Sequence, residues 1–99
     1  MLNSKQRSYL RGLASLTEAV YQIGKGGVSE NMLKQLDDAL TARELIKITV
    51  LRNAEDSAKG FVGELADKLN AEPVAAIGGK VILFRRSDKE NIKHIVLPE

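Results

Sequence analysis

The tetrad Gly24-Lys25-Gly26-Gly27 contains the residues of this chain that are best suited to binding a ligand. An apolar segment, residues 19–23, precedes it, and a helical pattern with Ser29 as its cap follows it. Backbone amides at the start of a helix have partial positive charge and bind phosphate, glycine allows close approach, and Lys25 adds a full charge. The tetrad therefore predicts a phosphate-binding loop. A tight turn without a ligand is the alternative, because such a turn also favours glycine.

The spacing around the tetrad does not match the known nucleotide motifs. A P-loop needs G-x-x-x-x-G-K-[ST], which is absent. A dinucleotide fingerprint needs G-x-G-x-x-G, but Ser29 occupies its third glycine position, and the acidic residue that would serve it, Glu44, opens a strand. What remains is G-x-x-G between a strand and a helix, the arrangement with which KH domains clamp the backbone of a single nucleic-acid strand.

Residues for catalysis or metal binding are scarce. The chain has no cysteine, and its one histidine, His94, lies in a charged C-terminal segment where a surface position is the ordinary expectation. The adjacent carboxylates Asp37-Asp38 and Glu55-Asp56 are interpreted as helix-surface or helix-start charges. We therefore expect no catalytic residues, no metal site, no cofactor and no small-molecule substrate. A small phosphoryl-handling enzyme is disfavoured for the same reason.

The composition indicates one small globular domain. Of the 99 residues, 43% are hydrophobic and 28% charged, with a formal net charge of +2. We expect a single domain over residues 1–99, with 87–99 as a C-terminal tail. No apolar run approaches the ~20 residues that span a bilayer, and no signal-peptide core is evident. The predicted location is the cytoplasm, without a membrane partner.

The positive charges are concentrated near the two ends of the chain. Residues 1–17 contain Lys5, Arg7 and Arg11 and no acid. Residues 85–94 contain five basic residues against Asp88 and Glu90. A basic face on a nearly neutral protein is typical of a polyanion binder, although an ordinary solvated surface is an equally good interpretation of charge alone.

Hydrophobic periodicity predicts the order α-β-α-β-α-β-β. The helices are expected over residues 3–15, 29–42 and 55–70, and the strands over 18–23, 44–51, 73–77 and 80–86. Ser4 and Ser29 are the expected caps of the first two helices, and Gly78-Gly79 is the expected hairpin turn. This order predicts an α/β two-layer sandwich with the two long helices on one face of the sheet. The first helix packs at an edge or on the remaining surface.

Several blocks of the sequence together resemble one family. They are Lys5-Gln6-Arg7 with Leu10-Arg11 and Leu13-Ala14, then Gln22 to Gly27, Glu44 to Ile48, Ile77-Gly78 and Leu83-Phe84-Arg85. Their order and spacing resemble the CRM domain (chloroplast RNA splicing and ribosome maturation), and more narrowly the stand-alone bacterial YhbY-like proteins, over residues 3–86. The chain departs from that pattern at Ser15 to Ala19, where family members often have His and Pro, and at Val28, where leucine is common.

The resemblance implies a fold like the C-terminal domain of translation initiation factor three. Its four-stranded mixed sheet would have the order 1-2-4-3, with the last strand antiparallel and an added N-terminal helix. The resemblance also implies RNA binding and association with precursors of the large (50S) ribosomal subunit. Carried over by position, the RNA-binding residues are Gly24, Lys25, Gly26, Gly27, Lys5, Arg7, Arg11, Lys47 and Arg85.

The leading hypothesis is a non-catalytic RNA-binding protein that binds ribosomal RNA during assembly of the large subunit. Of the four aromatic residues, Tyr9 is the one candidate for stacking on a base, so backbone contacts should dominate the affinity. The alternative is a protein-interaction module that docks a ribosomal protein or assembly factor through an exposed sheet face. Val20, Leu45 and Leu51 motivate that alternative.

Overall fold

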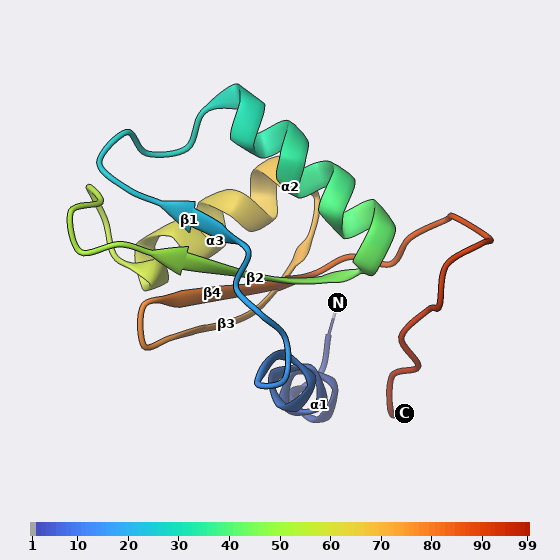
Figure 1. The fold of residues 1–99 in the computed structure, drawn as a ribbon. Coiled ribbons are helices and arrows are strands. Elements are labelled where there is room, and N and C mark those ends of the chain that lie inside the picture. The colour runs from blue at the N-terminus through green and yellow to red at the C-terminus, as the bar shows by residue number, and fades with distance from the viewer. Residues whose placement is uncertain (1) are drawn as a thin grey trace.

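The computed structural model describes residues 2–99, which form three helices and one four-stranded sheet (Figure 1). The elements are α1 (Ser4–Ala14), β1 (Tyr21–Ile23), α2 (Glu30–Arg43), β2 (Leu45–Val50), α3 (Ala58–Leu69), β3 (Glu72–Ile77) and β4 (Lys80–Phe84). Over these residues no helix is both long and apolar enough to cross a membrane.

The sheet has the strand order β1-β2-β4-β3, as expected from the resemblance. β1 runs parallel to β2, with Tyr21 opposite Ile48, and β4 runs antiparallel to both β2 and β3. The glycine pair Gly78-Gly79 closes the β3–β4 hairpin, and both residues have positive φ, which glycine adopts without steric cost. The mixed sheet and its predicted order are therefore confirmed.

One face of the sheet is covered by α2 and α3, which confirms the predicted two-layer sandwich (Figure 1). Side chains alternate between the two faces along a strand. Ile46 and Ile48 therefore point toward these helices, whereas Leu45 points to the opposite face of the sheet. They pack with Leu36, Leu40 and Leu65 in the larger of two buried clusters, and this cluster sets where the helices lie on the sheet.

The opposite face is covered by α1 and the C-terminal tail, so α1 lies on the remaining surface and not at an edge. Leu10 and Ala14 of α1 pack on Leu45, Ile82 and other sheet residues in a second buried cluster. Leu45 is only 6% exposed. The expectation that Leu45 lies on an open sheet face, available to dock a partner, is therefore wrong. Val20 and Leu51 do remain exposed, but they lie outside both buried clusters.

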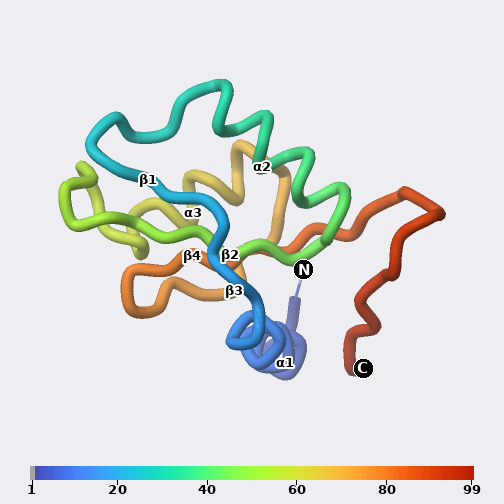
Figure 2. Tube along the Cα trace, viewed as in Figure 1, coloured from blue at the N-terminus to red at the C-terminus, as the bar shows by residue number. Residues whose placement is uncertain are grey.

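The tail is an extended segment without helix or strand that runs past the end of α2 and returns toward α1 (Figure 2). Ile95 and Leu97 pack against the second cluster, and the Gln6 side-chain amide donates to the Pro98 carbonyl at 3.1 Å. The end of the chain is thereby held against its first helix.

The helix starts are set by capping side chains, and one of them differs from the prediction. Ser29 caps α2 as expected, but Asn3, and not Ser4, caps α1. The Asn3 side chain accepts from the Gln6 amide at 2.8 Å, and the Gln6 side chain accepts from the Asn3 amide at 3.1 Å. This reciprocal capping box satisfies two free amides, whereas a cap at Ser4 lacks the glutamine three residues later.

Two other elements, β1 and α3, begin three residues later than predicted. β1 comprises only Tyr21–Ile23, and residues 18–20 before it have no regular structure. Residues 15–17 continue α1 as a turn in which the amides of Leu16 and Thr17 donate to the carbonyls of Leu13 and Ala14. α3 begins at Ala58 because Ser57 accepts from the Gly60 amide and caps the helix there. Residues 55 and 56 therefore lie in the preceding loop.

The two glycines inside α3 have different surroundings. A Cβ at Gly60 would overlap the carboxylate of Asp56, which accepts from the Ser57 amide at 2.7 Å. A Cβ at Gly63 would meet no atom within 4 Å. Packing therefore explains the glycine at position 60, and nothing in the structure explains the one at position 63.

We expect Gly63→Ala to raise the free energy of unfolding by about 0.5–1 kcal/mol, because alanine restricts the unfolded chain and fits the helix. Gly60→Ala should bring little or no gain, since Asp56 must give up its hydrogen bond, worth about 0.5–1.5 kcal/mol. Urea unfolding measures both. In an Asp56→Ala background, Gly60→Ala should raise the free energy of unfolding as Gly63→Ala does. Equal effects of Gly60→Ala and Gly63→Ala in the wild-type background would contradict this account.

Candidate nucleic-acid interface

The tetrad forms a tight turn between β1 and α2. The Gly27 amide donates to the Gly24 carbonyl at 3.0 Å, so Lys25 and Gly26 occupy the tip of the turn. Both tip residues are exposed to solvent. The turn therefore presents backbone and one lysine side chain outward, as a phosphate-binding loop requires.

The three glycines of this turn meet different demands. Gly27 has φ +69°, in the left-handed region that favours glycine. A Cβ at Gly24 would lie 3.4 Å from Leu51 Cδ1, which is an ordinary contact. A Cβ at Gly26 would meet nothing within 4 Å, and its φ is not positive. The fold thus requires glycine at position 27 and does not require it at position 26.

Two side chains at the start of α2 reduce its attraction for an anion. Ser29 accepts from the Met32 amide at 3.1 Å, and Glu30 places a carboxylate in the first turn. Within the segment from the turn to the start of α2, Lys25 and the turn backbone are therefore the groups best placed to attract an anion.

The loop between β2 and α3 lies beside the tetrad, because β1 and β2 are parallel and their carboxyl ends meet at one edge of the sheet. Leu51 and Asn53 of this loop approach Gly24, and the Leu51 amide donates to the Ile23 carbonyl at 2.8 Å. Arg52 between them is exposed. Sequence reasoning missed Arg52, although its place directly after the predicted second strand could have indicated it.

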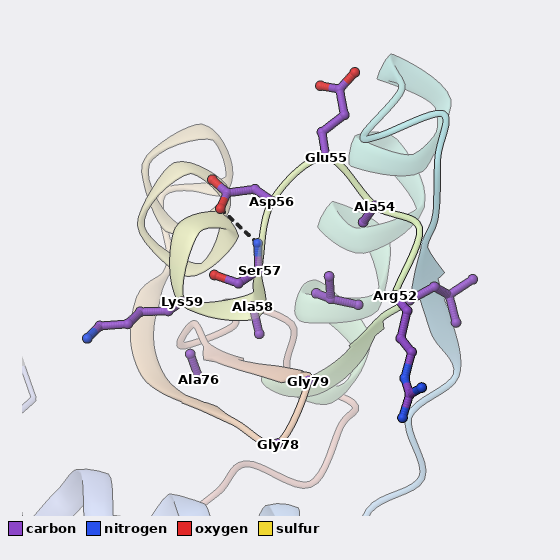
Figure 3. Close-up of a pocket in the computed structure, with 12 residues that line it drawn as sticks. Arg52, Ala54, Glu55, Asp56, Ser57, Ala58, Lys59, Ala76, Gly78 and Gly79 are labelled. Carbon is purple, nitrogen blue, oxygen red and sulfur yellow. Dashed lines mark hydrogen bonds between the residues drawn. The ribbon is translucent and has the colours of Figure 1, made fainter.

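A hollow of about 610 Å³ lies between this loop and the β3–β4 hairpin (Figure 3). Arg52 points away from Glu55 and Asp56, which lie toward the start of α3 (Figure 3). The two acids offset the charge of Lys59 at the α3 end of the hollow, whereas Arg52 on the other side points away from both acids.

The cations of α1 form a separate basic region. Lys5, Arg7 and Arg11 are all exposed, and α1 has no acidic residue. In Figure 1, α1 lies on the side of the sheet opposite α2 and α3, away from the tetrad. The predicted site residues therefore fall into two regions, the turn and the α1 surface.

Two other predicted RNA contacts have intramolecular partners. The Lys47 ammonium donates to the carbonyls of Ala14 at 3.1 Å and Thr17 at 3.4 Å, at the end of α1. The Arg85 guanidinium donates to the Asp37 carboxylate at 2.6 Å and to the Leu69 carbonyl at 2.8 Å. These bonds tie α1 to β2 and both long helices to the segment after β4. Contact of Lys47 and Arg85 with RNA stays a prediction.

The buried polar centre of the molecule is the carboxylate of Glu44, which is 0% exposed. One oxygen accepts from Arg86 and from the Ile95 amide, and the other accepts from the Ser87 amide and from His94 Nδ1, each at 2.8 Å. All four donors lie after β4, so one carboxylate holds the tail. The sequence suggested neither this role nor a partner for His94.

The same contacts set the ionisation of the cluster. Burial alone would raise the pKa of Glu44, but the bonds from Ser87, His94, Ile95 and Arg86 together lower it to about 2. The hydrogen bond to the Glu44 carboxylate raises the pKa of His94. The second ring nitrogen of His94 lies 2.7 Å from the Lys89 carbonyl. Since both partners are acceptors, the arrangement suits a protonated ring.

Comparison with known proteins finds one matching family. The family model described as the CRS1/YhbY (CRM) domain matches residues 2–85. A Bacillus subtilis protein named "Probable RNA-binding protein YqeI" is 43% identical over 98 residues, which are 99% of this chain and 100% of that protein. A Haemophilus influenzae protein named "RNA-binding protein" is 29% identical over 93% of each chain.

A solved structure has the same fold. The solution structure of a hypothetical protein from Staphylococcus aureus matches with a TM-score of 0.77 and 43% sequence identity. The match covers 96% of this chain and 100% of that one. The similarity thus includes most of the C-terminal tail as well as the sheet and helices.

Acid should weaken the fold through Glu44. Its pKa is about 2 when folded against an ordinary 4.5, so its contribution is complete above about pH 4.5 and is lost as the pH falls toward 2. The stability difference between wild type and Glu44→Gln should therefore shrink by about 3 kcal/mol from pH 6 to pH 2. Urea unfolding at several pH values measures this.

Glu64→Gln is the matched control, because Glu64 is exposed on α3 and pairs only with Lys68 at 3.6 Å among the ion pairs of residues 2–99. Its difference from wild type should stay nearly constant with pH. A constant difference for Glu44→Gln would refute the anchoring role.

Proposed function

The chain belongs to the CRS1/YhbY (CRM) domain family, and from this premise we propose that it is a non-catalytic RNA-binding protein. We further propose that its target is ribosomal RNA in precursors of the large (50S) subunit during ribosome assembly. The turn Gly24–Gly27 is the proposed contact with the RNA backbone, assisted by Lys5, Arg7 and Arg11. Relatives named as RNA-binding proteins support the general function.

The observation that carries the proposal is the geometry of Gly26. This residue is exposed at the tip of the turn, has no positive φ, and would have empty space around a Cβ. A glycine that the turn does not need is explained if a ligand must come close to the backbone at that point. Lys25 beside it supplies the charge that a phosphate requires.

Arg52 extends this contact. It lies in the loop whose Leu51 amide donates to the Ile23 carbonyl beside the turn, so one phosphate group of a strand can meet Lys25 while a neighbouring one meets Arg52. The mechanism is therefore phosphate capture at the edge of the sheet where β1 and β2 end. Phosphate contacts position a protein on nucleic acid without reading its sequence, so binding should depend on RNA structure and on salt.

The target can be tested in cells. Crosslinking followed by sequencing of the bound RNA should enrich precursor large-subunit ribosomal RNA over mature ribosomal RNA and messenger RNA. Enrichment of another RNA class would retain RNA binding and reject the ribosomal assignment.

Lys25→Ala should weaken binding to single-stranded RNA about equally for all sequences. The loss of one phosphate contact should also make the slope of log K against log salt shallower by about 0.7. Fluorescence anisotropy over a salt series measures both. Lys68→Ala is the control: Lys68 lies in the last turn of α3, outside the proposed RNA contact, and its loss should leave the wild-type salt slope unchanged. A changed sequence preference with an unchanged slope would instead indicate base reading at Lys25.

Gly26→Ala should leave the free energy of unfolding within about 0.5 kcal/mol of wild type, because the added methyl meets nothing in the fold. RNA affinity should fall roughly tenfold, comparable to the loss of one hydrogen bond to a phosphate. Gly63→Ala, the same change at another unobstructed glycine, should leave RNA affinity unchanged. Unchanged affinity of Gly26→Ala would place the RNA contact elsewhere.

A further inference from the structure

A groove separates α1 from the C-terminal tail, on the side of the sheet away from the turn. Its volume is about 350 Å³, within the range of about 300–1,000 Å³ that is common for ligand sites. The residues that line it are Tyr9, Leu13, Lys93, His94, Ile95 and Val96. Two segments from opposite ends of the chain, residues 9–13 and 93–96, therefore form its two walls.

Four of the six lining residues, Tyr9, Leu13, Ile95 and Val96, give the walls an apolar and partly exposed surface. Tyr9 is 43% exposed and Val96 is 82% exposed, so a large aromatic and a branched side chain meet solvent on the two sides. Leu13 and Ile95 pack on the second buried cluster beneath them, which holds both walls in place. The groove can thus accept a flat apolar group without rearrangement of the core.

The charge around the groove is positive. Lys93 and His94 line it from the tail, and Lys5 lies one helical turn before Tyr9 on the same face of α1. α1 contains no acid, and the nearby Glu44 carboxylate is buried and fully occupied by its four donors. The rim therefore favours an occupant that combines a flat ring with negative charge.

We propose that this groove binds one nucleotide of a single RNA strand, with the base stacked on Tyr9 and the adjoining phosphate beside Lys93. The proposal rests on the RNA-binding function proposed above and adds a base contact to its backbone contacts. Aromatic stacking of this kind accepts any base, because every base has a π face.

The helix surface next to Tyr9 is open to such an occupant. Gly12 lies three residues after Tyr9 and hence beside it on α1, and a Cβ at Gly12 would meet nothing within 4 Å. Apart from its two chain neighbours, no described residue therefore fills the space directly above Gly12, next to Tyr9 on the helix surface.

The first test measures affinity. The probe is a fluorescent single-stranded RNA of about twelve nucleotides, within the site sizes known for single-strand binders. Tyr9→Leu should weaken binding about 5- to 100-fold with no change in salt slope, because it removes stacking and no charge. Tyr9→Phe keeps the ring and should bind like wild type. Val96→Ser, on the opposite wall, should also weaken binding, and the same RNA annealed into a duplex should be insensitive to Tyr9→Leu.

The second test observes the ring directly. The chain has no tryptophan and two tyrosines, so in a Tyr21→Phe background the tyrosine emission comes from Tyr9 alone. Saturating single-stranded RNA should quench that emission, and Lys25→Ala should leave the quenching at saturation intact.

The outcomes separate this proposal from the function on which it rests. RNA binding that weakens with Lys25→Ala but not with Tyr9→Leu, together with unquenched Tyr9 emission, would overturn the base site and retain the RNA-binding function. The groove would then suit a protein partner. No RNA binding by the wild-type protein at low salt would overturn both.

Discussion

The buried carboxylate of Glu44 is the interaction on which the arrangement of this small protein depends. Glu44 ends α2 and precedes β2 with φ 68°, a conformation that non-glycine residues rarely adopt and that costs about 1 kcal/mol or more. Its amide donates to Leu40 and its carbonyl accepts from Arg85, each at 2.8 Å. The backbone is thereby held on both sides while the side chain points inward. Four hydrogen bonds from the segment after β4 satisfy the buried charge, which would otherwise be strongly destabilising.

The anchored tail and α1 together cover the second face of the sheet. A four-stranded sheet with helices on one face leaves its other face apolar, and here Leu45, Ile82 and Phe84 would be open to water. α1 covers part of that face, and the tail held by Glu44 brings Ile95 and Leu97 against the same cluster. The groove beside Tyr9 exists only because both segments lie there.

Residues of the same chemical type have different roles in this fold. Lys25 and Arg52 are exposed beside the turn, whereas Lys47 and Arg85 use their donors to join helices to the sheet. Lys47 also places positive charge at the end of α1, where it complements the helix dipole. Charge patterns in a sequence therefore indicate a polyanion binder without showing which cations remain available to it.

The sequence by itself determined the local structure and its order. Apolar periodicity, the Ser29 cap and the Gly78-Gly79 turn are interactions between residues a few positions apart, so the helices, the strands and the exposed glycine turn could be predicted from them. The strand order 1-2-4-3 came from the resemblance to a family and was confirmed. Only the tertiary structure decided which residue caps α1, that Leu45 is covered, that Arg52 lies beside the tetrad, and that Glu44 and His94 form a pair. The partners of Glu44 are 42 to 51 residues away in the chain, and no local pattern of spacing encodes contacts at that separation.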